Sequence, residues 1–95
     1  MIKNIDKLSK TQKKILYYIL QYQEQFGYSP TRREIVEYFS ITRTRGYSRQ
    51  WAEYHLQEME RMEVVKRGKP TFRRNIEIIF CDEKDKEVLQ KETLG

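Results

Sequence analysis

The sequence predicts a small, mainly α-helical domain closed by a β-hairpin, because three helix signals precede two strand signals within 95 residues. Two of the helix starts have capping-box spacing, and the two extended runs flank a turn that contains Gly68 and Pro70. Three helices followed by a two-stranded wing make the winged helix-turn-helix arrangement. The hairpin depends on the helices, since an isolated two-stranded hairpin is marginally stable at best.

The first helix is expected to begin near Ser9 and to stop at Gly27. Ser9 and Gln12 have capping-box spacing, in which each side chain satisfies a backbone N–H of the helix start. Gly27 suits the left-handed conformation that often ends a helix. Apolar residues follow the cap at helical spacing and predict the buried stripe: Ile15, Leu16, Ile19, Leu20 and Phe26.

The second helix is predicted to open at Thr31, which repeats capping-box spacing with Glu34. It should be short and end around Phe39 or Ser40. We expect its buried side to consist of Ile35, Tyr38 and Phe39.

A polar turn over residues 41–47 leads to the third helix, which is predicted to open on the capping residue Ser48. This helix should run from Arg49 to about Met62. Ala52, Leu56 and Met59 form the apolar stripe by which it docks on the domain.

Residues 64–67 and 74–80 are predicted to be the two strands of the wing. The composition becomes acidic and polar after Asp82. We therefore expect a winged helix-turn-helix domain over residues 1–81, followed by a polar, acidic tail over 82–95 that is either a short helix or disordered.

The composition favours a polyanionic partner and gives little support to other classes. The net charge is +5 and the pI is about 9.4, although excess charge by itself is weak evidence. Cys81 is the single cysteine, the N-terminus lacks a signal-peptide core, and no apolar run could span a membrane, so a cytoplasmic location is expected. One His and one Cys far apart argue against a zinc site, and we expect no metal and no cofactor. The sequence lacks a phosphate-binding glycine loop, HExxH or a nucleophile elbow, which argues against an enzyme.

The outer face of the third helix carries side chains suited to reading base-pair edges. Arg pairs with guanine, Gln with adenine, and Glu accepts from cytosine. All three types occur in its first turn and a half, where a recognition helix enters the major groove. The alternative is an ordinary solvated helix face, and Trp51 can belong either to the core or to the DNA side. The candidate base-reading residues are Arg49, Gln50, Trp51, Glu53 and Tyr54, and Ser48 at the cap can reach a phosphate.

A second group of basic residues surrounds the predicted hairpin turn and extends to the loop before the third helix. Such a wing can lie along the DNA backbone or enter the minor groove. The alternative is a charged strand edge that maintains solubility. Crowding so many like charges favours an anionic partner, so these residues are predicted to hold phosphates: Arg43, Arg45, Lys66, Arg67, Lys69, Arg73 and Arg74.

Three stretches resemble the N-terminal DNA-binding domain of the LexA repressor family: residues 8–12, residues 27–35 (GYSPTRREI) and residues 48–56 (SRQWAEYHL). The resemblance covers roughly Leu8 to Phe80. It implies a winged helix-turn-helix that binds operator DNA as a homodimer with the third helix in the major groove. The family's base-reading positions fall on Ser48, Gln50, Trp51, Glu53 and Tyr54.

The chain departs from the family pattern in three respects. The turn before the third helix is longer, and Trp51 and Tyr54 are bulkier than the usual residues, so the family's operator should not be assumed. No part of the 95 residues resembles the self-cleaving protease domain of LexA, so damage-triggered autoproteolysis is not expected.

The sequence therefore predicts a repressor-like transcriptional regulator that binds double-stranded DNA, is associated with the nucleoid and catalyses no reaction. The rival interpretation is a winged-helix module that docks a protein partner in a replication or conjugation complex. In that case Tyr17, Tyr18, Tyr22 and Trp51 would be exposed interface anchors, because aromatic residues are enriched at such surfaces.

Overall fold

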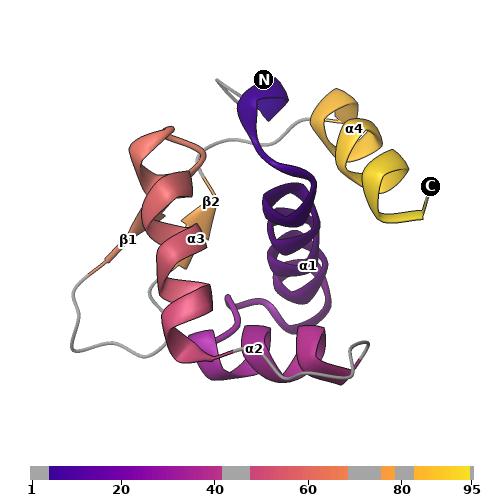
Figure 1. Ribbon diagram of the computed structural model, residues 1–95. Helices are drawn as coiled ribbons and strands as arrows, with labels where there is room; N and C mark the ends of the chain where they lie inside the picture. The colour runs from indigo at the N-terminus through magenta and orange to yellow at the C-terminus, as the bar shows by residue number, and fades with distance from the viewer. Residues whose placement is uncertain (1–4, 42–47, 69–75, 79–82, 95) are drawn as a thin grey trace.

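The computed structural model describes residues 5–41, 48–68, 76–78 and 83–94 (Figure 1). A short 3-10 helix, η1 (Ile5–Lys7), precedes the long helix α1 (Lys10–Phe26). Helices α2 (Arg32–Ile41) and α3 (Arg49–Arg61) follow, then the strands β1 (Val65–Arg67) and β2 (Ile76–Ile78), and finally helix α4 (Glu83–Leu94). The predicted fold class is confirmed: a mainly helical domain with one two-stranded antiparallel sheet.

The starts of α1 and α2 form the capping boxes that the sequence predicts. The Ser9 hydroxyl accepts from the Gln12 amide and the Gln12 side chain accepts from the Ser9 amide, both at 3.1 Å. In α2 the Glu34 amide donates to the Thr31 hydroxyl at 3.1 Å, and the Thr31 amide donates to the Glu34 carboxylate at 2.9 Å. Gly27 ends α1 with a φ of 81°, where a side chain would be strained.

Helix α3 begins and ends close to its predicted bounds. The Ser48 hydroxyl caps it by accepting from the Trp51 amide at 3.1 Å, and Met62 is its C-cap. Its predicted docking stripe is confirmed, because Ala52, Leu56 and Met59 are almost fully buried. Helix α2 continues to Ile41, slightly beyond the expected end.

The two strands pair antiparallel in the register Val65↔Ile78, Lys66↔Glu77 and Arg67↔Ile76. Val65 and Ile76 are buried, whereas Lys66 and Glu77 face solvent. The sheet therefore has one face against the helices and one exposed face, as expected of a wing at the edge of a helical domain.

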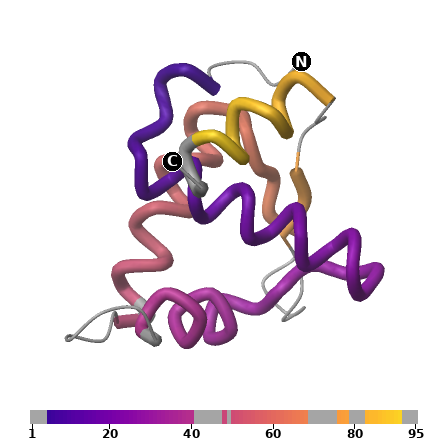
Figure 2. The backbone as a smooth tube through the Cα atoms, turned by 90° about the vertical axis from the view of Figure 1, so that its right-hand side faces the viewer, coloured from indigo at the N-terminus to yellow at the C-terminus, as the bar shows by residue number. Residues whose placement is uncertain are grey.

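Helix α4 packs beside α1, as the ribbon and the backbone tube both show (Figures 1 and 2). Leu89 is fully buried and belongs to the same hydrophobic cluster as Ile15, Leu16 and Ile19. The Lys86 ammonium lies 2.7 Å from the Glu24 carboxylate and adds a surface link between the two helices. The segment expected to be a polar tail thus contributes a leucine to the core.

Two of the predicted core residues lie at the surface. Phe26, in the last turn of α1, is 47% exposed, and Tyr38 of α2 is 48% exposed. Both pack against other aromatic rings instead of entering the core. The ring centroid of Tyr38 lies 4.2 Å from that of Tyr18, and the centroid of Phe26 lies 4.5 Å from that of Tyr22. Helical spacing could not distinguish these positions, because a surface aromatic cluster has the same period as a core stripe.

Candidate nucleic-acid interface

Helix α3 lies between α2 and β1, so the helix-turn-helix pair and the wing meet along it (Figure 1). Its buried stripe fixes its rotation and turns the opposite face outward. This placement is the one that a recognition helix requires, with a neighbouring helix behind it and a wing at its side.

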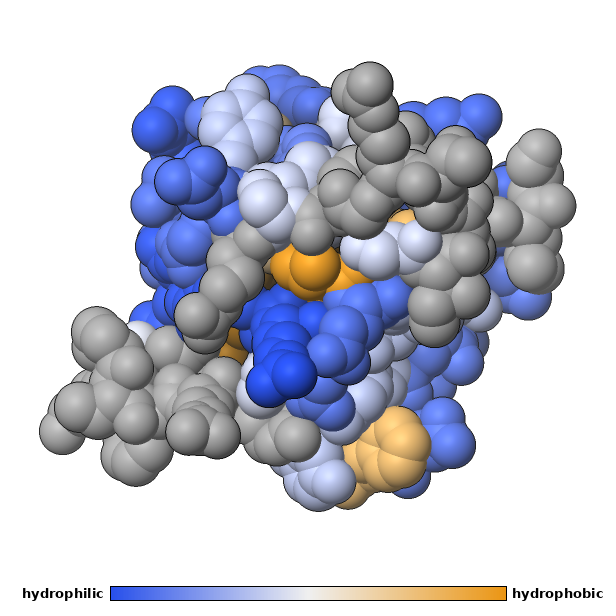
Figure 3. Space-filling model, turned by 60° about the horizontal axis from the view of Figure 1, so that its bottom comes forward, coloured by the Kyte–Doolittle hydropathy of each residue, from blue (hydrophilic) through white to orange (hydrophobic). Residues whose placement is uncertain are grey.

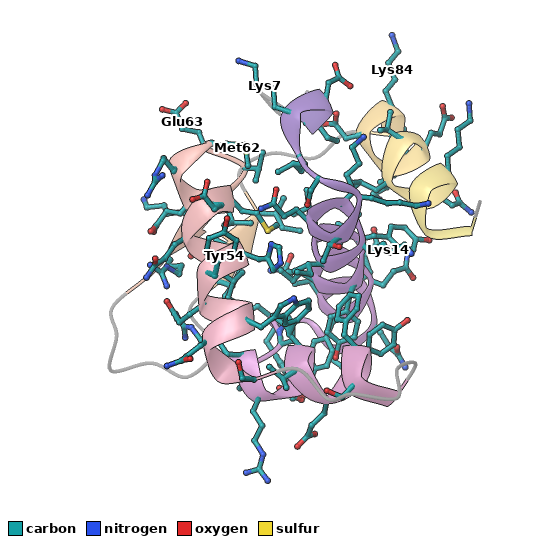
Figure 4. The ribbon with its side chains drawn as sticks, in the orientation of Figure 1. Lys7, Lys14, Tyr54, Met62, Glu63 and Lys84 are labelled. Carbon is teal, nitrogen blue, oxygen red and sulfur yellow. The ribbon has the colours of Figure 1, made fainter. Side chains whose placement is uncertain are left out.

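The outward face of α3 carries exposed polar side chains in a single row. Gln50, Tyr54, Gln57 and Arg61 are exposed and are separated by four, three and four residues, which places them on one side of the helix. Tyr54 is 60% exposed and lies about midway along α3 (Figure 4). Gln57 and Arg61 were not among the candidate site residues, although the same spacing from Gln50 would have identified them.

Trp51 lies on the core side of this face. It is half-buried and packs against the hydrophobic cluster, with its ring centroid 5.7 Å from that of Phe39 and 5.2 Å from that of His55. The sequence did not decide whether Trp51 belongs to the core or to the DNA side. In the structure, Trp51 packs between α2 and α3.

Glu53 forms ion pairs on either side of α3. One carboxylate oxygen pairs with the Arg32 guanidinium of α2, and the other accepts from Nη1 of Arg67 of β1 at 2.7 Å. Burial opposes the charged form of Glu53, but the hydrogen bond from Arg67 and the charge of Arg32 together hold its pKa below the usual value. Both oxygens that would accept a hydrogen bond from cytosine are thus already engaged.

Arg67 is held by two carboxylates of α3. Besides Glu53, the Glu60 carboxylate accepts from Nη2 at 3.1 Å, from Nε at 3.3 Å and from the Arg67 amide at 3.3 Å. The side chain is only 19% exposed. Burial acts to lower the pKa of Arg67, and the hydrogen bonds to the two glutamates outweigh it and raise the pKa. Arg67 therefore joins the wing to α3, a position different from the phosphate-facing one expected.

His55 links α3 to the start of α1. His55 is half-buried, and its Nδ1 lies 3.2 Å from Nε2 of Gln12. The Gln12 amide oxygen accepts from Ser9, so its nitrogen faces the ring and donates to Nδ1. Burial lowers the pKa of His55, and the charge of Glu58 opposes the shift in part.

The predicted phosphate-binding residues are described only in part. Lys66 is exposed on β1 beside the buried Val65. Arg43, Arg45, Lys69, Arg73 and Arg74 lie outside the described residues. Arg49 occupies the first position of α3, but its side chain also lies outside them.

The surface at the α2 end of the molecule is mostly hydrophilic among the residues coloured in Figure 3. Within the part of the chain that the structure describes, no cluster of three or more His, Cys, Asp or Glu side chains could hold a metal ion. None of the described helices combines the length and the apolar character needed to cross a lipid bilayer.

Comparison with protein families gives a match over residues 5–74 to the family described as LexA DNA binding domain. The chain belongs to this family. Comparison with curated proteins finds no match. The family match supports DNA binding and a repressor-like function. It ends before β2 and α4, so the second strand of the wing and the final helix lie outside the matched part of this LexA-family domain.

Proposed function

We propose that this LexA-family domain is a sequence-specific transcriptional regulator that binds double-stranded DNA with α3 in the major groove and its basic wing on the backbone or in the minor groove. In this role it performs no chemistry, needs no cofactor and acts in the cytoplasm on nucleoid DNA. The observation that carries the proposal is the exposed row on α3, placed between a helix-turn-helix partner and a wing.

The row offers the chemistry that base reading requires. The amide of Gln50 can donate to and accept from adenine, and Tyr54 can contact a thymine methyl or a phosphate. Ser48 and the amide groups of the helix start can hold a phosphate next to them. Arg49 adds a guanine-pairing side chain at the same end of α3, and the half-buried Trp51 would contact DNA only at its exposed edge.

The wing supplies the contacts that do not depend on base sequence. Lys66 is exposed on β1, and Lys69, Arg73 and Arg74 follow it in the sequence, with Arg43 and Arg45 preceding α3. Each basic side chain that neutralises a phosphate releases a counterion, which makes affinity fall as salt rises.

Fluorescence anisotropy with labelled duplex DNA at several salt concentrations tests the proposal directly. We expect tight binding at low salt with a steep linear fall of log affinity against log salt. Absence of salt-dependent binding to any duplex would contradict DNA recognition.

Two variants separate base reading from backbone binding. Gln50→Ala should lose preference at one base pair, about 1–3 kcal/mol, with little change in nonspecific binding. Lys66→Ala should weaken binding to all duplexes alike and reduce the slope of log affinity against log salt by about 1, the contribution of one phosphate contact. If both variants bound every duplex like the parent protein, the groove assignment would fail.

We further propose that the protein binds its operator as a homodimer, as the family resemblance implies. Selection of bound sequences from a random duplex pool tests this, because a two-fold symmetric dimer selects a palindrome and fixes the half-site spacing. A non-palindromic selected site bound by one copy would show that the domain acts as a monomer.

A protein-docking module is the second candidate, and the surface aromatic residues favour it. Phe26, Tyr28 and Tyr38 are all about half exposed. Tyr17, Tyr18 and Trp51, which the sequence offered as anchors, instead pack against the core. Anisotropy distinguishes the two functions, since a docking module without DNA affinity gives no salt-dependent signal.

A further inference from the structure

We propose that Glu53 is a positioning residue that locks the wing strand and α2 onto the recognition helix, and that the base reading on α3 falls to the exposed row beside it. The expected effect of Glu53 on DNA binding rests on the proposed function, whereas its role in holding β1 and α2 to α3 does not. It assigns Glu53 and Arg67 a role different from the base and phosphate contacts that their positions in the sequence suggest.

The geometry places Glu53 at the meeting point of three elements. Arg32 comes from α2, Glu53 and Glu60 from α3, and Arg67 from β1. The four side chains alternate in charge, Arg32–Glu53–Arg67–Glu60, so each inner member faces two opposite charges. A chain of this kind restrains the angle between wing and helix more than an isolated surface pair does.

Withdrawing Glu53 from this chain to read a base would leave two guanidinium groups without their shared carboxylate. Arg67 is mostly buried, and Arg32 is also more buried than exposed, with a side chain 24% exposed. Leaving partly buried charges unpaired is costly. Gln50 and Tyr54, in contrast, are exposed and can meet a base without breaking an ion pair of the described residues.

The arrangement has a consequence for the basic residues of the wing. Arg67 is the last residue of β1, so fixing it to α3 fixes the point at which the chain leaves for the hairpin turn. Lys69, Arg73 and Arg74 follow in the sequence, and their reach toward a phosphate depends on that exit direction. Glu53 would thus influence DNA affinity through the wing without touching DNA.

The first test uses the free protein and does not require DNA. Glu53→Gln keeps the size of the side chain and removes its charge, and Glu37→Gln is a matched control because Glu37 also pairs with an arginine, Arg33, but on the exposed face of α2. We expect amide hydrogen exchange in β1 to become about tenfold faster in Glu53→Gln, with exchange at Leu56 and Met59 unchanged. Equal exchange of β1 in the two variants would overturn the proposal.

The second test measures DNA binding of the same two variants. Both raise the net charge from +5 to +6, so general attraction to DNA should strengthen both. Positioning predicts the opposite for Glu53→Gln: about tenfold weaker binding to all duplexes and a smaller salt slope, with an unchanged selected sequence. A loss of stability alone would not alter the salt slope of the folded protein.

Base reading by Glu53 gives a different outcome and would overturn the inference: Glu53→Gln would change the selected base at one position and keep the salt slope. Arg67→Gln provides an independent variant if Glu53→Gln does not fold, and it should accelerate exchange in β1 by a similar factor. If the parent protein bound no duplex at all, the proposed function would fail, while the exchange experiment would still decide whether Glu53 holds the wing.

Discussion

The inner and outer sides of α3 show opposite relations to the rest of the molecule. The inner side is almost inaccessible to solvent: Ala52, Leu56 and Met59 are at most 1% exposed. The outer side presents Gln50, Tyr54 and Gln57 to solvent. A helix whose polar face served solubility alone would tolerate any polar residues there, whereas this face carries amides and a phenol with defined hydrogen-bonding patterns.

Glu53 belongs to neither side. Helix α3 thus carries two kinds of polar residue, those exposed to solvent and one that forms ion pairs with neighbouring elements. The Glu53 carboxylate is turned along the edge of α3 toward the arginines of α2 and β1. Helix α3 therefore has a side that stabilises the fold, an edge that aligns neighbouring elements, and a face available to a partner. Each of these assignments can be broken by a different substitution.

The largest effect is expected on the inner side. Leu56→Ala removes a fully buried side chain from the centre of the hydrophobic cluster and should lower the free energy of unfolding by about 2–5 kcal/mol. Urea denaturation followed by circular dichroism measures the change. The neighbouring exposed residue supplies the control, since Gln57→Ala should stay within about 0.5 kcal/mol. Similar losses in both variants would contradict the assignment of the two sides.

The next largest effect is on the outer face and appears in DNA binding. Gln50→Ala should leave the free energy of unfolding within about 0.5 kcal/mol of the parent value, because the side chain is exposed. Discrimination at one base pair should fall by about 1–3 kcal/mol, measured by competition between the selected duplex and single-base variants. A variant that lost stability but kept its discrimination would place Gln50 in the fold and remove it from the reading face.

The starts of α1, α2 and α3 and the end of α1 could be predicted from the sequence because their signals are local. Ser9 with Gln12, Thr31 with Glu34, and Gly27 each act within one helical turn, and the structure confirms all three. The buried stripe of α3 follows in the same way from the period of its apolar residues. The family could also be recognised from the sequence, because the stretches that resemble it are short and continuous.

The relations between elements could not be predicted in this way. Nothing in the spacing of Glu53 and Arg67, fourteen residues apart, shows that a strand places them 2.7 Å from one another. An exposed aromatic cluster and a core stripe share the same helical period, which is why Phe26 and Tyr38 were expected inside. The contribution of Leu89 to the core likewise depends on how α4 packs against α1, which no pattern inside α4 reveals.

A smaller effect distinguishes the two serine caps at the starts of α1 and α3. Ser9 takes part in a reciprocal capping box with the buried Gln12, whereas Ser48 accepts from Trp51, whose side chain cannot return the hydrogen bond. Ser9→Ala should therefore cost about 1–2 kcal/mol in the free energy of unfolding, and Ser48→Ala about 0.5–1 kcal/mol. Thermal unfolding of both variants under one condition compares them. A larger cost for Ser48→Ala would show that the start of α3 is more tightly held than its exposure indicates.

The smallest effect is a pH dependence at His55, on the border between the two sides of α3. Burial lowers its pKa in the folded protein, so the unfolded chain binds more protons at mildly acidic pH and stability falls as pH falls. The loss begins near the ordinary His pKa of about 6.5 and is complete below the lower folded value. His55 is the only histidine, which separates this window from the carboxylates that titrate at lower pH.

Urea unfolding at pH 7.5, 6.5 and 5.5 measures this dependence, with His55→Gln as the variant that cannot titrate. The parent protein should lose stability across the series while His55→Gln stays nearly level. Protonating Nδ1 would set a donor against the Gln12 amide nitrogen, so ring NMR signals should report a neutral Nε2–H tautomer at pH 7 and a pKa below the usual value. If stability rose toward pH 5.5, the folded protein would favour the charged form of His55. The hydrogen bond from Gln12 to a neutral ring would then be wrong.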